Sequence, residues 1–275
     1  MEFRELLNTP GPVLLDGGMG TMLQARGLSI GEWPELAALE HPDWLEDIHR
    51  AYVEAGAQIL CSNTFGANRE KLGRTGRTVE EVVPPSVEIA RRAARGRALV
   101  ALDVGPTGQL LEPTGTLRFE EAVDIFAQTV RAGVQAGADL ILIETMTDLQ
   151  EARAALLAAK ENSSLPVIVT MTYEERGRTF LGCDPASAAL TLEGMGADAI
   201  GVNCSLGPRE MPPLVRELTR WSTLPIAIKP NAGLPDPGGA GYDITAEEFA
   251  GSMAELTGLG VKLYGGCCGT TPEYI

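Results

Sequence analysis

Short apolar segments alternate with helical patterns along the whole chain of 275 residues. This alternation is typical of a parallel sheet covered by helices, because parallel strands are buried on both faces and are joined by helical crossovers. We predict strands at 13–17, 58–63, 98–104, 140–144, 166–171, 199–204, 225–229 and 261–265. Helical patterns separate them at 43–55, 79–95, 119–136, 148–160, 185–195, 208–219 and 246–257.

A repeated glycine phrase precedes three of these strands, at 54–57, 135–139 and 194–198. Glycine commonly ends a helix in the left-handed conformation, so each phrase is typical of a helix that stops and turns into the next strand. The α/β repeat favours a (β/α)₈ TIM barrel, which typically takes ~250 residues, over an open Rossmann-like sheet. No composition break divides the sequence, so residues 1–275 are predicted to be a single domain. Because the chain stops soon after the eighth strand, we expect a truncated eighth helix and a longer native polypeptide.

The net charge of the chain limits the kinds of molecule that it is expected to bind. The net charge of −15, from 37 acidic and 22 basic residues, argues against nucleic acid or an anionic membrane. No apolar stretch approaches the ~20 residues of a membrane span, and the charged start is unlike a signal peptide. Five cysteines without a secreted-type spacing suit a reducing compartment. We therefore expect a cytoplasmic protein.

Three cysteines stand at predicted strand exits, which in a parallel barrel form the active-site face. Cys267 and Cys268 are adjacent, and their Cα separation of ~3.8 Å is too short for an unstrained disulfide. Strands six and eight contribute to the same layer of a barrel, so Cys204 can meet this pair. Three thiolates suit zinc and leave a fourth tetrahedral position open, as in catalytic sites. Copper(I), an iron–sulfur cluster, or three buried cysteines without a metal are the alternatives.

Carboxylates also end apolar strands, where a charge is costly unless it is paired. Asp16 and Glu144 can hold the ammonium group of a ligand; alternatively, Asp16 caps its glycine turn and Glu144 pairs inside the barrel. Asp103 precedes a Gly-Pro turn, and for it we expect mainly a structural role.

Two other features carry less chemistry. The glycines at 17–20 do not match the G-x-G-x-x-G spacing of a dinucleotide loop and more simply permit a tight turn. His41 and His49 lie before and within the first predicted helix, where we expect both to be solvated. A histidine general base is therefore not predicted.

Six motifs together resemble the homocysteine S-methyltransferase family, and most closely the amino-terminal homocysteine-binding domain of cobalamin-dependent methionine synthase. They lie at 14–24, 63–65, 105–108, 201–204, 230–235 and 265–272, so the resemblance spans nearly the whole chain. The Gly-Gly-Cys-Cys-Gly ending combined with Gly-Val-Asn-Cys is its most specific part. One departure is Lys229, where the family more often has an aromatic residue or histidine.

The resemblance implies a barrel methyltransferase whose Zn²⁺ is held by Cys204, Cys267 and Cys268. It implies that homocysteine is the substrate, that methylcobalamin is supplied by another domain, and that folate-binding and cobalamin-binding domains are partners in the same polypeptide. By this resemblance, the sulfur of homocysteine would occupy the open zinc position and attack an electrophilic methyl group. No catalytic residue would be needed beyond the zinc site.

The same resemblance suggests the substrate contacts. Asp16 and Glu144 match acids that engage the amino group of homocysteine, with Gly17 and Gly18 beside them. Backbone N–H groups near Gly17, Gly18 and Thr64 are expected to receive its carboxylate. Asn63 is placed at the same substrate site.

Several functions remain open at this point. Within the same chemistry, the chain can be a stand-alone methyltransferase that uses betaine or S-methylmethionine, or the homocysteine domain of a fusion with a folate reductase. It can also be a zinc and amino-acid binding module that is inactive without partner domains. A redox protein that uses the Cys267-Cys268 pair is the third class.

Overall fold

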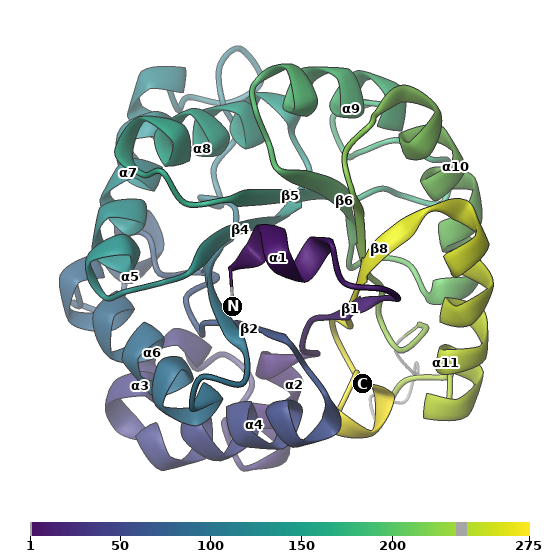
Figure 1. Ribbon diagram of the computed structural model, residues 1–275. Coiled ribbons are helices and arrows are strands. Elements are labelled where there is room, and N and C mark those ends of the chain that lie inside the picture. The colour runs from purple at the N-terminus through teal and green to yellow at the C-terminus, as the bar shows by residue number, and fades with distance from the viewer. Residues whose placement is uncertain (1, 235–240) are drawn as a thin grey trace.

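The computed structural model describes residues 2–234 and 241–275. These residues form an eight-stranded parallel sheet in the order β1-β8-β7-β6-β5-β4-β3-β2 (Figure 1). A parallel bridge between Leu15 and Ile59 joins the two outer strands, so the sheet is a nearly closed barrel and the predicted fold class is confirmed. The strands are β1 (Val13–Leu14), β2 (Ile59–Cys61), β3 (Leu99–Val104), β4 (Leu140–Met146), β5 (Val167–Met171), β6 (Ala199–Asn203), β7 (Ile226–Lys229) and β8 (Val261–Tyr264).

Helices surround this barrel. Those predicted from the sequence are α4 (Pro42–Ala55), α6 (Val79–Ala94), α7 (Phe119–Gln135), α8 (Leu149–Asn162), α9 (Pro185–Gly194), α10 (Met211–Trp221) and α11 (Ala246–Glu255). Four shorter helices were not predicted: α1 (Phe3–Leu7), α2 (Met19–Ala25), α3 (Ala37–Glu40) and α5 (Arg69–Leu72). Within the described residues, no helix has the length and apolar character needed to cross a membrane.

The repeated glycine phrase has the predicted backbone conformation. Gly56, Gly137 and Gly196 have φ angles of 114°, 89° and 87°. These values lie in the left-handed region, where a side chain would be strained. Each glycine therefore lets the chain leave a helix and enter the following strand, β2, β4 or β6.

Side chains alternate between the inside and the outside of the barrel. The inward apolar residues form one cluster with Phe3 and Leu6 of α1, which lies across the ring of strands (Figure 1). This cluster closes the amino-terminal end of the barrel. The outward residues pack against the surrounding helices in a second, larger cluster.

Toward the carboxyl ends of the strands, the inward-facing residues change from apolar to charged. Two residues beyond the inward Ala101, Leu142 and Ala227 stand Asp103, Glu144 and Lys229, all buried. The apolar interior is thus capped by a layer of charged groups. This layer is the floor of the candidate site.

Candidate metal and substrate site

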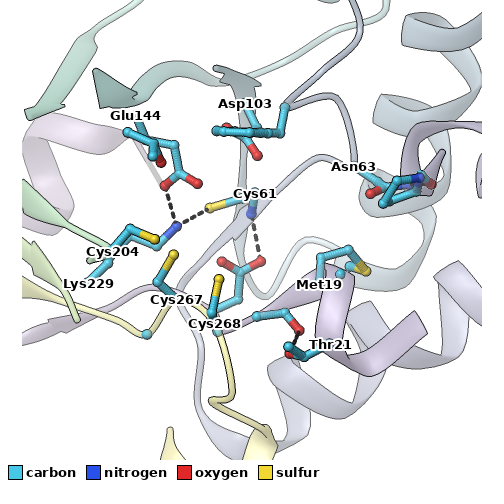
Figure 2. Close-up of a pocket in the computed structure, with 18 of the residues that line it drawn as sticks. Met19, Thr21, Cys61, Asn63, Asp103, Glu144, Cys204, Lys229, Cys267 and Cys268 are labelled. Atoms are coloured by element: carbon cyan, nitrogen blue, oxygen red, sulfur yellow. Dashed lines mark hydrogen bonds and ion pairs between the residues drawn. The ribbon is translucent and has the colours of Figure 1, made fainter. Parts of the chain in front are cut away.

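A cavity of about 350 Å³ opens at the carboxyl ends of the strands (Figure 2). Its lining brings together the three predicted zinc ligands and the predicted substrate residues Asp16, Gly17, Gly18, Asn63 and Glu144. It also contains residues that the sequence analysis did not assign to substrate, namely Cys61, Asp103 and Lys229. Their signal in the sequence was the period-two alternation of the strands, which places them inward.

The Sγ atoms of Cys204, Cys267 and Cys268 all lie within 4.8 Å of one another. Tetrahedral zinc with Zn–S bonds of ~2.3 Å separates neighbouring sulfurs by roughly 3.8 Å, so small side-chain adjustments fit this cluster to the ion. The donor set is soft, which suits zinc and excludes the hard cations. The three residues are half-buried, with one side of the cluster facing the cavity.

The end of β7 and the two residues after it orient the three cysteines by accepting hydrogen bonds from their backbone N–H groups. The N–H of Cys204 donates to the carbonyl of Lys229 at 3.0 Å, and that of Cys267 donates to Pro230 at 2.9 Å. The N–H of Cys268 donates to Oδ1 of Asn231 at 3.2 Å. The Pro230-Asn231 motif therefore has a positioning role that the sequence reasoning had not assigned to it.

Cys204 is held in an uncommon backbone conformation. Its φ is 59° and that of Ser205 is 60°, in the left-handed region that costs a non-glycine residue free energy. The preceding Asn203 is anchored by its side-chain oxygen, which accepts from the Thr145 N–H and the Thr170 hydroxyl, each at 2.8 Å. Such anchoring fixes the end of β6, so the Cys204 thiol is directed toward the doublet.

The close packing of the thiols shifts the pKa values of Cys267 and Cys268 in opposite directions. Hydrogen bonding by the thiols of Cys204 and Cys267 lowers the pKa of Cys268 to about 3. Hydrogen bonds with Cys204 and Cys268 raise the pKa of Cys267 well above its usual value. The cluster by itself therefore favours a single thiolate, and a bound cation would supply the charge that allows all three to ionise.

The glycine turn after β1 packs against the cysteine loop. The Gly18 N–H donates to the carbonyl and hydroxyl of Thr270, at 3.0 and 3.1 Å. The Thr64 N–H donates to Ser62 at 2.8 Å. These two amides have acceptors within the protein, for which a substrate carboxylate would have to compete, and the predicted carboxylate contact near Gly17, Gly18 and Thr64 stays a prediction.

Asn63 and Thr64 differ in their relation to the cavity. Asn63 lines it and donates its side-chain amide to the carbonyl of Pro34 at 2.5 Å. Thr64 is not among the lining residues, and its hydroxyl donates to the carbonyl of Asp103 at 2.7 Å. Thr64 thus supports the end of β3.

Asp16 is buried and half-satisfied. Its Oδ2 accepts the Cys61 N–H at 2.7 Å, whereas Oδ1 has no hydrogen-bond partner in the described part of the chain. Burial raises the pKa of Asp16 to about 6, against the attraction of the nearby Lys229 ammonium. The carboxylate is therefore short of a cationic partner.

Glu144 has such a partner in Lys229, whose Nζ lies 2.7 Å from its Oε2. The same Nζ lies 3.2 Å from Sγ of Cys61, and Figure 2 shows both contacts. Burial disfavours a charged ammonium, but the surrounding acidic groups outweigh this effect and raise the pKa of Lys229. This contact is the pairing inside the barrel that was the alternative for Glu144, and its predicted contact with the substrate stays a prediction.

Asp103 is 6% exposed and lines the cavity. Its Oδ1 has no partner within the described residues. Burial, with repulsion from Glu144, raises its pKa well above the ordinary value. The structural role predicted for Asp103 does not explain why one oxygen of its buried carboxylate has no hydrogen-bond partner among the described residues.

The two histidines lie away from the site, and one prediction about them is wrong. His49 is fully buried in α4, and neither ring nitrogen is hydrogen-bonded to any described residue. Burial lowers its pKa to about 3. His41 is half-buried and stacks on Trp44 with ring centroids 4.1 Å apart. The apolar face of α4 explains the burial of His49, because its neighbours one turn away, Leu45 and Val53, face the core.

A nearly closed barrel with a cluster of three thiols suited to a metal ion at its carboxyl end is typical of metal-dependent barrel proteins. The chain matches a model of the family described as homocysteine S-methyltransferase over residues 13–275. It therefore belongs to the homocysteine S-methyltransferase family, a family of methyltransferases.

Relatives agree with this assignment. The chain is 35% identical to methionine synthase of Mycobacterium leprae (strain TN) over 282 residues, which cover 94% of this chain and 23% of that protein. The chain is 36% identical to methionine synthase of Mycobacterium tuberculosis (strain ATCC 25618 / H37Rv) over 283 residues, which cover 94% of this chain and 24% of that protein. The chain thus spans about a quarter of the length of these relatives.

A solved structure shares the architecture. The crystal structure of the metallated form of the homocysteine methyltransferase MmuM from Escherichia coli matches with a TM-score of 0.85 at 25% identity. The match covers 98% of this chain and 96% of that one.

Pro235, at the end of the motif at 230–235, lies outside the described residues.

Proposed function

We propose that this chain binds homocysteine through a zinc ion held by Cys204, Cys267 and Cys268 and methylates its sulfur to form methionine. The observation that carries the proposal is the placement of three clustered thiols and a set of buried carboxylates in one cavity. The thiol cluster suits a metal that accepts sulfur, and the carboxylates suit the ammonium of an amino acid.

Each part of the chain has a defined task in this reaction. Zinc bound to the three thiolates would supply Lewis acidity that keeps a substrate thiol ionised at neutral pH. The Pro230-Asn231 segment holds the cysteine backbones in register, and the acidic layer that includes Asp16 orients the amino acid. Phe3 and Leu6 seal the opposite end of the barrel, so substrate enters from the carboxyl side.

The methyl transfer itself needs no general base from the protein. The thiol proton is released to water when the substrate binds. A sulfur lone pair then forms the S–C bond, while the bond between the methyl carbon and its donor breaks and its electron pair leaves with the donor. The absence of a histidine from the cavity lining is consistent with this scheme within the described residues.

Methylcobalamin carried by another domain is the donor we propose, with a folate-binding domain as a further partner. The support is the 35–36% identity to methionine synthases, of which this chain matches about a quarter. The unpaired thiols of the site require a reducing environment, so a cytoplasmic location is part of the proposal.

A barrel that acts alone on a small donor is the second candidate. The likeness to the MmuM structure favours it, because 96% of that homocysteine methyltransferase is covered by a chain of this size. Betaine and S-methylmethionine are the small donors to test.

The experiment combines metal analysis with donor assays. Zinc-loaded protein is incubated with homocysteine and either methylcobalamin, betaine or S-methylmethionine, and methionine is quantified. We expect about one zinc per chain and turnover with methylcobalamin. Turnover with a small donor alone would remove the cobalamin assignment, and methionine formation equally fast in metal-free protein would remove the zinc mechanism.

A further inference from the structure

Two glycine-rich segments meet beside the cavity. One is the turn after β1, residues 16–20, which carries Asp16. The other is the loop after β8, residues 265–271, which carries Cys267 and Cys268. In the proposed function the turn faces the amino-acid part of the substrate and the loop holds the metal. Their contact is therefore where the two halves of the substrate site join.

The turn and the loop pack backbone against backbone. A Cβ on Gly17 would stand 2.6 Å from Oγ1 of Thr270, and a Cβ on Gly18 would stand 2.7 Å from the carbonyl oxygen of Cys267. Real Cβ atoms essentially never come within 3.0 Å of such atoms, so no side chain fits between the two segments. A shift of either segment would therefore have to move the other.

Hydrogen bonds join the same two segments. The Gly266 N–H donates to the carbonyl of Asp16 at 3.0 Å, and the Gly18 N–H donates to both oxygens of Thr270. The Thr270 hydroxyl in turn donates to the carbonyl of Cys267 at 2.7 Å. Thr270, which is fully buried, thus links the turn to the backbone of a predicted metal ligand.

Tyr52 of α4 holds this contact from outside the cavity lining. Its side chain is fully buried, and its hydroxyl donates to the carbonyls of Thr270, at 2.9 Å, and of Gly18, at 3.3 Å. Each carbonyl also has another donor, the Gly18 N–H for Thr270 and the Thr21 hydroxyl for Gly18. The Tyr52 hydroxyl is therefore not needed to satisfy either oxygen, and its effect is to bind both segments with one group.

We propose that Tyr52 and Thr270 are positioning residues that couple metal binding to amino-acid binding: each ligand orders the joined segments, so either ligand raises the affinity for the other. The inference rests on the proposed function, because it takes homocysteine as the molecule that meets both segments. A ligand that orders a segment loses binding free energy to that ordering, and a second ligand that meets the ordered segment loses less. Such coupling is reciprocal, so both affinities change by the same factor.

The coupling has a consequence for the metal-free protein. Without zinc the turn is less well ordered, so the chain binds the amino-acid part of its substrate weakly. Metal-free protein then leaves homocysteine in solution instead of holding it in an unreactive complex. Zinc prepares the amino-acid site as well as the site for the sulfur.

L-2-Aminobutanoate tests the coupling, because it has the carbon skeleton of homocysteine without the sulfur and therefore forms no metal–sulfur bond. Calorimetric titrations of zinc-loaded and zinc-free protein give its two dissociation constants. We expect wild type to bind it about 10-fold more tightly when zinc is bound, which is within the usual range for coupled sites. Chelator competition with and without L-2-aminobutanoate should give the same factor for zinc.

Tyr52→Phe keeps the buried ring, removes the hydroxyl and leaves both carbonyls with a donor, so we expect it to fold. Its coupling factor should fall to within about twofold of one. Thr270→Val, which removes the link to Cys267, should lower the factor in the same way, and it tests the coupling even if Tyr52→Phe does not fold. Tyr264→Phe is the matched control and should keep the wild-type factor, because the Tyr264 hydroxyl donates to Thr257 at 3.2 Å and lies outside the cavity lining.

The ratio of the two affinities separates coupling from a structural role. A structural role would weaken L-2-aminobutanoate equally with and without zinc, so an unchanged factor in Tyr52→Phe or Thr270→Val overturns the role of that residue. A wild-type factor near one overturns the whole inference, as does zinc-loaded wild type that binds L-homocysteine but not L-2-aminobutanoate; the proposed function stands in both cases. Zinc-loaded wild type that binds neither compound overturns the proposed function and this inference with it.

Discussion

Lys229 Nζ lies 2.7 Å from Oε2 of Glu144, and both side chains are almost completely buried, at 3% and 9% exposure. The pair spans the barrel interior between β7 and β4. Removing two charges from water is costly, so a buried pair adds little net stability by itself. Its strength appears when one partner is lost, because the other is then buried alone.

Replacing Lys229 by methionine should therefore destabilise the protein strongly. We expect the free energy of unfolding to fall by about 3–5 kcal/mol, because Glu144 is then a buried acid without its partner. Urea unfolding at pH 7.5 measures this loss. Adding Glu144→Gln to Lys229→Met removes the unpaired charge and should restore most of the stability. A double variant no more stable than Lys229→Met would contradict the account.

Zinc retention should depend on all three clustered cysteines. Cys204→Ala, Cys267→Ala and Cys268→Ala each remove one thiolate from the donor set, so bound zinc should fall to near zero after dialysis, as measured by elemental analysis. Cys183→Ala is the matched control, because Cys183 lies outside the cavity lining and should leave the zinc content unchanged. Full retention in any one of the three would remove that cysteine from the ligand set.

Gly266 is predicted to be intolerant of even one methyl group. A Cβ at this position would stand 2.1 Å from Oγ1 of Thr270, which accepts the Gly18 N–H and donates to the Cys267 carbonyl. Gly266→Ala should thus displace Thr270, disturb the cysteine loop and weaken zinc binding in a chelator competition. Gly251→Ala is the control, since a Cβ there meets nothing within 4 Å. In α11 that alanine should stabilise by up to about 1 kcal/mol. Equal zinc affinity in the two variants would show that the close packing at Gly266 is unimportant.

The barrel and the cluster of three thiols could be predicted because both leave local signals. Apolar runs and glycine-ended helices mark each repeat, and Cys204 and the Cys267-Cys268 doublet stand at strand exits of the same parity. The contacts that side chains at the strand exits make across the barrel leave no local pattern in the sequence. The partner of Glu144 is Lys229, 85 residues away, and the sequence showed only that Lys229 departs from the family pattern.

Asp103 and His49 illustrate the same limit from two sides. Asp103 stands two residues beyond the inward Ala101, so alternation alone placed it inside the barrel, yet the Gly-Pro turn after it suggested a structural role. His49 was expected to be solvated from its place within the first predicted helix. Its helical spacing from Leu45 and Val53 was the better guide, since it puts all three on the buried face of α4.

The buried His49 should make the protein sensitive to acid. Burial lowers the folded-state pKa to about 3, while the unfolded chain has the ordinary value of about 6.5. Below pH 6.5 the unfolded state therefore binds a proton that the folded state does not, and stability falls by about 1.4 kcal/mol for each further pH unit. His49→Leu removes this contribution, so its free energy of unfolding relative to wild type should rise by about 2 kcal/mol between pH 7.5 and pH 5, as measured in urea. His41→Leu, at a half-buried histidine, reports the general effect of losing an imidazole. A difference between His49→Leu and wild type that stays constant with pH would show that His49 is protonated equally in both states.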